Sequence, residues 1–488
     1  MKIKLCMLGV ILIAFLSASA QHQHPAPKKE KTMQDTLKRK HPSKRMKMPK
    51  KMPADTVRRP KQKHDMHHMD SMQHMDHGSK MQMQGGDIPM GHSYSLNLPM
   101  SRNGSGTSWL PDDSPMYGIM LHSKKWMYML HGNIDLRYTK QDLGDKGTRG
   151  DDVFDAPNWF MAMGQRKVGS SGLFHFSSMI SLDRFTEGGN GYPLLFQTGE
   201  SWQDIPLIDR QHPHDLFSEL SVGYSHAFSK KADLIVYLGY PGEPAIGSTA
   251  FMHRPSAFPN PDAPIGHHWN DGTHITFGVA TLGFRYDKFK IEASSFTGRE
   301  PNENRLDFDK PRFDSWSGRL SFNPSKKLAF QVSRAFVKSP EALHPEDDVD
   351  RTIASIIYSN RLGEEKFLNL TTLWGVNKYS GHDGENTALL EGSLRLNRTV
   401  FYTRYEWVQK STEELGLDEL QYGEHTLFPV NALTLGLNHD LFRWSKFRLA
   451  GGAHLTGFSA DSRLNSLYGK NPLSGQVFLR LYPALMKM

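Results

Sequence analysis

Cysteine is almost absent from this sequence of 488 residues, which contains only Cys6. That residue lies in an N-terminal stretch with two early lysines, an apolar run from Leu5 to Leu16, and the small residues 18–20. The pattern is typical of a secretory signal peptide, with a retained anchor as the alternative. Cleavage before Gln21 would leave a mature chain without cysteine. We therefore expect no disulfide, thiolate metal site or cysteine catalysis.

Long apolar runs are also missing. After residue 20, no stretch reaches the roughly 18 apolar residues that a membrane-spanning helix needs. If the protein spans a membrane, we expect it to do so with β-strands.

Aromatic and β-branched residues are scarce in residues 21–110, which are rich in Lys, Pro, Met, His and Gln. Such a segment buries too little apolar surface to fold, so we predict a disordered tail between a signal peptide (1–20) and a β-barrel (111–488). The basic residues behind the formal net charge of +8 gather in this tail. Since the chain is exported, lipid head groups are a better partner for that charge than nucleic acid.

From Trp126 onward, the sequence consists of runs of about 10 to 14 residues in which apolar and polar side chains alternate. In the first run, one face has Tyr128, Leu130 and Leu136, and the other has Asp135 and Arg137. One face suits lipid and the other a polar lumen. A soluble β-sandwich is the alternative, since it also produces such runs.

The connections between these runs favour a membrane barrel. Short turns such as 229–231 and 397–398 alternate with long loops such as 187–214 and 242–272. Short periplasmic turns and long external loops are typical of outer-membrane barrels. We predict an all-β, antiparallel up-and-down barrel of about 16 strands, with 12 to 18 possible, closed by the segment Gln476–Tyr482. Both chain ends would then lie on the periplasmic side.

The tail contains a dense group of methionine and histidine residues. Thioether sulfur suits Cu(I) and Ag(I), and imidazole also binds Cu(II), so we expect copper ions to bind here and expect no organic cofactor. A low-complexity tail without a metal, and a zinc or nickel tail, are the alternatives. The predicted ligands are His64, Met66, His67, His68, Met69, Met72, His74, Met75, His77, Met81, Met83, Met90 and His92.

The first three predicted strands carry further methionine and histidine residues on the faces that would point inward. These are Met127, Met129 and His131 on the first strand, Met161 and Met163 on the second, and His175 and Met179 on the third. If the strands are neighbours, these side chains could form a patch of soft ligands. The alternative is that methionine only fills irregular space.

The long loops are rich in histidine and proline. The residues that could converge on a second metal site are His212, His214, Asp215, His253, His267, His268 and His274. A loop that folds into the pore, with hydrogen-bonded histidines, is the alternative. An outer-membrane hydrolase using Ser218 or Ser256 is less favoured, because no G-x-S-x-G motif occurs.

The order of leader, Met/His-rich tail and barrel resembles the copper-resistance outer-membrane protein family CopB/PcoB. The resemblance rests on Met66-His-His-Met-Asp70 and Met75-Asp-His77. It implies copper sequestration or export at the outer membrane. The loop block 210–274 and the segment 294–301 look more like a family of uncharacterised bacterial outer-membrane proteins.

We therefore expect a non-enzymatic outer-membrane barrel whose periplasmic tail captures copper or another soft metal ion. Its expected partners are outer-membrane lipid, metal ions and a periplasmic copper-binding or efflux protein, and its size is compatible with an oligomer. The alternatives are a general porin or solute channel with an incidental tail, and a barrel enzyme.

Overall fold

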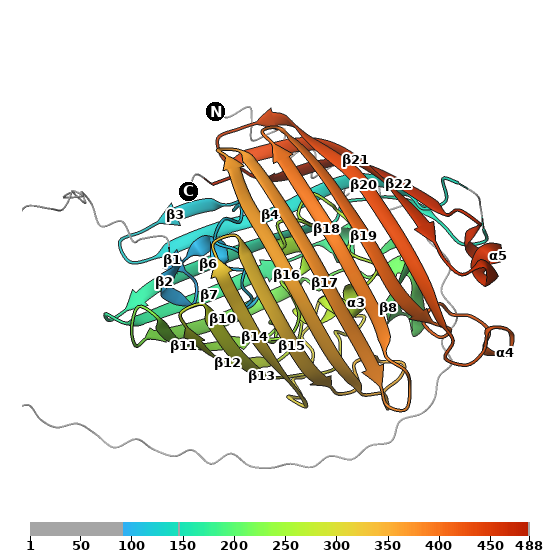
Figure 1. Ribbon diagram of the computed structural model, residues 1–488, viewed down its shortest axis with the longest axis horizontal. Coiled ribbons are helices and arrows are strands. Elements are labelled where there is room, and N and C mark those ends of the chain that lie inside the picture. Colours follow the sequence, from blue (N-terminus) through green and yellow to red (C-terminus); the bar gives the residue numbers. More distant parts are fainter. Residues whose placement is uncertain (1–90, 145–146, 487–488) are drawn as a thin grey trace, which may run out of the picture. The chain divides into compact units, whose positions relative to one another are not determined.

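The computed structural model describes residues 91–144 and 147–486. These residues form a closed antiparallel β-barrel, which confirms the predicted fold class (Figure 1). No described helix is long and apolar enough to cross a membrane. The strands of the barrel wall are β4 (Met127–Lys140), β6 (Asn158–Val168), β7 (Gly172–Ile180), β10 (Phe217–Ala227), β11 (Ala232–Gly239), β12 (Val279–Tyr286), β13 (Phe289–Phe296), β14 (Ser315–Ser325), β15 (Leu328–Val337), β16 (Val349–Gly363), β17 (Lys366–Tyr379), β18 (Glu385–Leu396), β19 (Thr399–Ser411), β20 (Leu427–Arg443), β21 (Phe447–Ser459) and β22 (Leu473–Pro483).

The wall has sixteen strand positions in the described part of the chain, as predicted. From β10 to β22, each strand pairs with the next one along the sequence. The predicted closing segment lies in β22, which pairs with β4 and so closes the ring. Two short strands, β3 (Ile119–His122) and β5 (Asp152–Asp155), pair with opposite ends of β4 without adding a position.

The alternation seen in the sequence sorts side chains between the two faces of the wall. On β4, Leu130 and Tyr138 are about 40% exposed on the outer face, whereas Asp135 and Arg137 are buried inside. The same pattern holds around the barrel, where buried arginines pair with inward carboxylates, such as Arg480 with Asp135 at 2.6 Å. The barrel is therefore apolar outside and charged inside.

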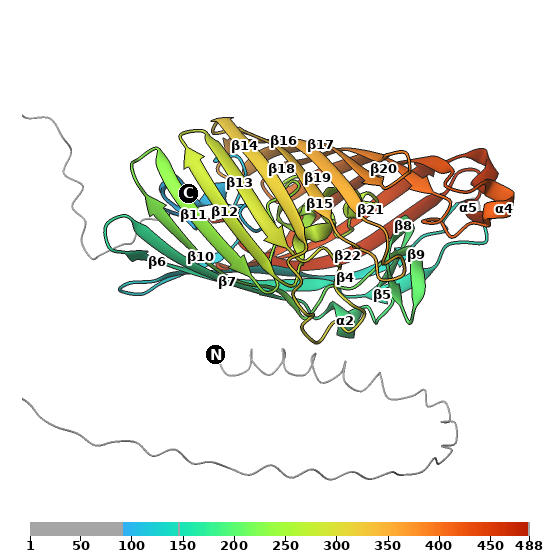
Figure 2. The same cartoon turned by 90° about the horizontal axis from the view of Figure 1, so that it is seen from below.

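The two ends of the barrel differ as predicted. The short turns lie at one end, and the long loops lie at the other, where they contain most of the remaining elements (Figures 1 and 2). These loop elements are α2 (Asp183–Thr186), the hairpin β8 (Tyr192–Trp202) and β9 (Ile205–Gln211), α4 (Glu419–Tyr422), η4 (Ser462–Leu464) and α5 (Asn465–Tyr468).

One long loop, residues 240–278 between β11 and β12, folds into the lumen, and we call it the plug segment. It contains η2 (Phe251–His253), α3 (His267–Asn270) and η3 (Gly272–His274). Figure 1 shows α3 behind the front wall, and α3 contacts β16, β17 and β18. Arg404 of β19 and Asn438 of β20 donate to the backbone carbonyls of Asp262 and Pro259, each at 3.0 Å. Since β19 and β20 lie eight positions from β11 and β12, the plug segment crosses the lumen.

Polar contacts attach the plug segment to this far wall. Arg254 pairs with Glu391 of β18 at 2.7 Å, and Asp262 pairs with His454 of β21 at 3.1 Å. Asp262 also accepts a hydrogen bond from Arg137 of β4 at 2.7 Å. These groups are buried, so each charge is compensated within the lumen.

Residues 91–110, which we expected to belong to the disordered tail, are folded. They include β1 (Gly91–His92), β2 (Ser95–Pro99) and η1 (Met100–Arg102), and they lie against the inner side of the barrel. Ser95 donates to Asp233 of β11 at 2.7 Å, and Thr107 accepts from Arg319 of β14 at 2.9 Å. Tertiary contacts with the charged lumen thus order a segment whose own composition predicts disorder.

Candidate functional site

Most of the predicted tail ligands lie outside the described residues: His64, Met66, His67, His68, Met69, Met72, His74, Met75, His77, Met81, Met83 and Met90. His92 alone is described. It is buried in β1, where its Nδ1 accepts from the backbone N–H of Tyr94 at 3.0 Å and its Nε2 has no hydrogen-bond partner.

Five of the seven inward methionine and histidine residues of the first three full strands lie opposite one another, whereas Met127 and His175 each lie opposite Gln165. Met129 of β4 lies opposite Met163 of β6, and His131 lies opposite Met161. Met161 lies in turn opposite Met179 of β7. Directly opposite residues of antiparallel strands share a face, so these side chains all point into the lumen.

A small cavity of about 90 Å³ lies against this patch. Four of the predicted residues line it, namely Met129, Met161, Met163 and His131. The remaining predicted residues of the patch, Met127, His175 and Met179, are buried nearby but do not line the cavity. His175 instead packs its ring against Tyr94, with centroids 5.0 Å apart.

Other parts of the chain complete the cavity lining. The plug segment contributes Met252 and His253, and the segment before β3 contributes Met100 and Met116. Six thioethers and two imidazoles thus surround one space, which we call the Met/His cavity. Only His253 of these four additional residues was a sequence candidate. No periodicity marks the three additional methionines, because loops carry them into the lumen.

The two imidazoles of the Met/His cavity lie near each other, with ring centroids 5.6 Å apart. Both also contact the indole ring of Trp159, at 5.3 Å for His131 and 4.9 Å for His253. Burial lowers the pKa of His253 to about 4, so its ring is neutral near pH 7. His131 Nε2 is buried without a hydrogen-bond partner. The cavity therefore offers uncharged sulfur and nitrogen donors.

Five of the seven predicted loop residues also converge. Their rings form a continuous row in which neighbouring centroids are 5.1–5.6 Å apart. In order, the row, which we call the histidine row, consists of His212, His268, His267, His274 and His214. His253 instead lines the Met/His cavity, and Asp215 pairs with Arg305 at 3.3 Å.

Each ring of the histidine row is held by its Nδ1 atom. Asp271 is 2.6 Å from His267 Nδ1, Asp183 is 2.7 Å from His214 Nδ1, and Glu300 is 3.3 Å from His268 Nδ1. The Nε2 atoms of all five rings have no hydrogen-bond partner, although His212 Nε2 lies 3.3 Å from a carboxylate oxygen of Glu200. Anchoring by Nδ1 is the usual arrangement of metal-binding histidines.

Burial lowers the pKa of His212 and His274, and repulsion from neighbouring imidazoles adds to the effect. Even so, in residues 91–144 and 147–486 no group of three or more His, Cys, Asp or Glu side chains is placed to hold a metal ion. The histidine row brings five of the predicted residues together, but metal binding there remains a prediction.

No known family model matches the sequence, and no curated protein is similar to it. Solved barrels are similar in part. OmpF of Salmonella typhi, solved as a complex with daunomycin, is 8% identical with a TM-score of 0.46 over 75% of this chain and 100% of its own. An anion-selective porin from Comamonas acidovorans is 13% identical, with a TM-score of 0.44 over 73% of this chain and 100% of the porin chain. OprB of Pseudomonas putida is 10% identical, with a TM-score of 0.43 over 73% of this chain and 94% of the OprB chain. These values give no basis for transferring a function.

Proposed function

We propose that this chain is a bacterial outer-membrane barrel that binds soft monovalent metal ions, Cu(I) or Ag(I), in its lumen. The observation that carries the proposal is the Met/His cavity, where six thioethers and two imidazoles surround about 90 Å³. The apolar outer face and the short-turn and long-loop ends support the membrane location. In this orientation the tail starts on the periplasmic side and captures the ion there.

The donor chemistry of the cavity matches such ions. Thioether sulfur is a soft, uncharged ligand that prefers Cu(I) and Ag(I) to harder divalent ions. Imidazole nitrogen completes the shell, and the neighbouring Trp159 ring can face a cation. A site made of neutral donors also favours a single positive charge, because no carboxylate lines this cavity to compensate a second one.

Simple packing is the competing explanation, because methionine fills irregular space in cores. A packing role would bring the six side chains together and leave little volume between them. Here they surround a cavity with room for an ion and a water molecule, given about 30 Å³ per water.

A general porin is the rival function. The plug segment crosses the lumen and is tied to the far wall by Arg254 and Asp262. Passage of an organic solute would therefore require the plug segment to move, whereas ion binding at the cavity would not.

Silver binding to the purified barrel tests the proposal. In a chain that lacks residues 64–90 and keeps β1, we expect Ag(I) to bind tighter than about micromolar by calorimetry. The triple variant M129L/M161L/M252L keeps the volume but removes three sulfurs, so binding should weaken at least about tenfold. The control M127L changes a buried inward methionine that does not line the cavity, and it should bind normally. Equal binding by both variants would contradict the proposal.

The role of the tail needs a separate experiment in cells. Copper and silver tolerance can be compared in a deletion strain that carries the full chain, the chain without residues 64–90, or the triple variant. We expect both altered chains to give lower tolerance than the full chain. Full tolerance without residues 64–90 would show that the tail is not needed for the function.

A further inference from the structure

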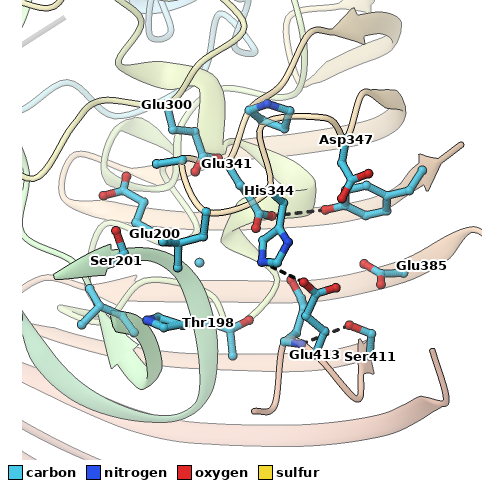
Figure 3. Close-up of a pocket in the computed structure, with 18 of the residues that line it drawn as sticks. Thr198, Glu200, Ser201, Glu300, Glu341, His344, Asp347, Glu385, Ser411 and Glu413 are labelled. Atoms are coloured by element: carbon cyan, nitrogen blue, oxygen red, sulfur yellow. Dashed lines mark hydrogen bonds and ion pairs between the residues drawn. The ribbon is translucent and has the colours of Figure 1, made fainter. Parts of the chain in front are cut away.

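A second and much larger cavity, of about 740 Å³, lies among the long loops (Figure 3). The hairpin of β8 and β9 and the loops after β13, β15, β17 and β19 line it. Ten of the lining residues are Asp or Glu, three are His, and none of them is Lys or Arg. We call this space the acidic cavity. Its carboxylates come from several sides, with Glu200 and Glu300 across the space from Glu385 in Figure 3.

Some of these carboxylates already have partners. Glu200 forms an ion pair with the buried Arg305, and Glu413 pairs with His344 at 2.8 Å. Glu414 is 3.6 Å from the buried Lys410. Glu303 accepts from the backbone N–H groups of Gln203 and Asp204, at 2.6 and 3.0 Å. These groups build the walls and are largely compensated.

Two further carboxylates of the lining, Glu385 and Glu341, lack an ion-pair partner among the described residues, and of the two only Glu385 is buried. Glu385 is only 6% exposed, lines the acidic cavity, and has an Oε2 atom without any hydrogen-bond partner. Glu341 has only a long hydrogen bond from the Tyr379 hydroxyl, at 3.4 Å. The positive charges of Lys410 and Arg351 act on Glu385 and Glu341, respectively, from beyond ion-pair distance. Burial raises the pKa of Glu341 to about 8, and the negative charges of Glu300 and Glu414 add to the effect. Because the raised pKa keeps Glu341 largely protonated near pH 7, a cation bound beside it would favour its charged form. The Glu385 Oε2 atom can accept a hydrogen bond from the same cation.

The size and the walls of the acidic cavity indicate which kind of cation. It falls in the range of small-molecule sites, about 300–1,000 Å³, and is far larger than a bare metal ion needs. Apolar side chains, including Leu207, Leu343 and Leu427, line the cavity together with the carboxylates. Apolar walls suit a hydrocarbon chain, and carboxylates at separate places in the lining suit ammonium groups spaced along that chain.

We propose that the acidic cavity binds an organic cation with two or more ammonium groups, of the aliphatic polyamine class. The ammonium groups pair with Glu341 and Glu385, and the methylene groups between them lie against the leucines. This site is separate from the Met/His cavity and does not rest on the metal-binding proposal. None of the residues that line the Met/His cavity lines the acidic cavity.

Calorimetry on the full-length protein in detergent tests the proposal, with spermidine as the probe. Spermidine should bind, and n-butylammonium and 1,4-butanediol, which have one and no ammonium group, should bind at least about tenfold more weakly. E341Q and E385Q should each weaken spermidine binding about tenfold, because each removes one charge-assisted contact. E346Q is the matched control, since Glu346 is exposed in the same loop as Glu341 and does not line the cavity. Heat-modifiable gel migration checks that each variant has folded.

The outcomes separate the alternatives. Weakening by E341Q and E385Q but not by E346Q supports the proposal, even if silver does not bind the Met/His cavity. Binding of Mg²⁺ but not spermidine would overturn it and indicate a hydrated metal ion. Equal spermidine binding by all variants would also overturn it, because the binding would then be unspecific surface attraction.

Discussion

The attachment of the plug segment to the opposite wall can be tested at Arg254, the side chain that pairs with carboxylates on both of these elements. Arg254 is fully buried and pairs with Glu391 of β18 at 2.7 Å and with Asp271 of the plug segment at 2.9 Å. The substitution R254M keeps most of the volume and removes the charge. Removal of one partner of a buried ion pair typically costs about 3–5 kcal/mol.

Both carboxylates keep a second partner in this variant. Glu391 still has Arg404 at 3.2 Å, and Asp271 still has His267 at 2.6 Å. We therefore expect a cost near the lower limit, about 3 kcal/mol. If this cost falls on the attachment of the plug segment, its detached state becomes about a hundredfold more populated. The variant should then show larger and noisier conductance in planar bilayers, and it should lose its heat-resistant gel form at a lower temperature.

The matched control is R334M. Arg334 forms an ion pair with Asp350 at 3.4 Å, but its side chain is 64% exposed, so the pair contributes at most about 1 kcal/mol. This variant should behave like the original protein. The reasoning would be refuted if R254M and R334M had the same conductance, or if the unaltered protein already conducted like an open porin.

Three further predictions concern the loops and the tail. G199A should destabilise the protein by about 1–3 kcal/mol in chemical unfolding, because Gly199 has φ +118° and an added Cβ would lie 2.5 Å from His268 Nε2. The control G381A is also at positive φ but in open space, so it should lower the unfolding free energy by less. The pKa of Glu341 is raised to about 8 in the folded protein, so its favourable contribution to the unfolding free energy is fully present below about pH 4.5 and is lost as pH rises to 8. E341Q should therefore reduce the decline in unfolding free energy between pH 4.5 and 8. An unchanged pH profile would contradict the assignment. A peptide covering residues 64–92 should bind Cu(I) more tightly than about micromolar in calorimetry, and weaker binding would remove the tail from the proposed function.

The barrel was predictable because its information is local. Successive side chains of a strand point alternately to the lipid and to the lumen. The period of two in residues such as Leu130, Asp135 and Arg137 therefore assigns each side chain to the outer or the inner face. The lengths of the connections then separate the two ends. The inward placement of Met129, His131, Met161 and Met163 follows from the same rule, since it needs only strand parity and neighbouring strands.

The plug segment and the folding of residues 91–110 were not predictable in this way. The sequence 240–278 has no period, and its conformation depends on partners far away in the chain, such as Glu391 and His454. The segment 91–110 looks like the tail by composition, yet Asp233 and Arg319 of the wall order it. Composition describes what a segment can bury alone and says nothing of a charged lumen built elsewhere.

By itself, the sequence determined that this chain forms a closed barrel with a charged interior. It also determined the order of the strands and the end of the barrel that has the long loops. Only the tertiary structure decided which donors meet. It brought Met100, Met116 and Met252 from separate segments to the Met/His cavity, joined five loop histidines into a row, and placed Glu341 and Glu385 in the lining of one cavity. The physical reason is that strand periodicity is a short-range property, whereas convergence of loops depends on contacts between residues hundreds of positions apart.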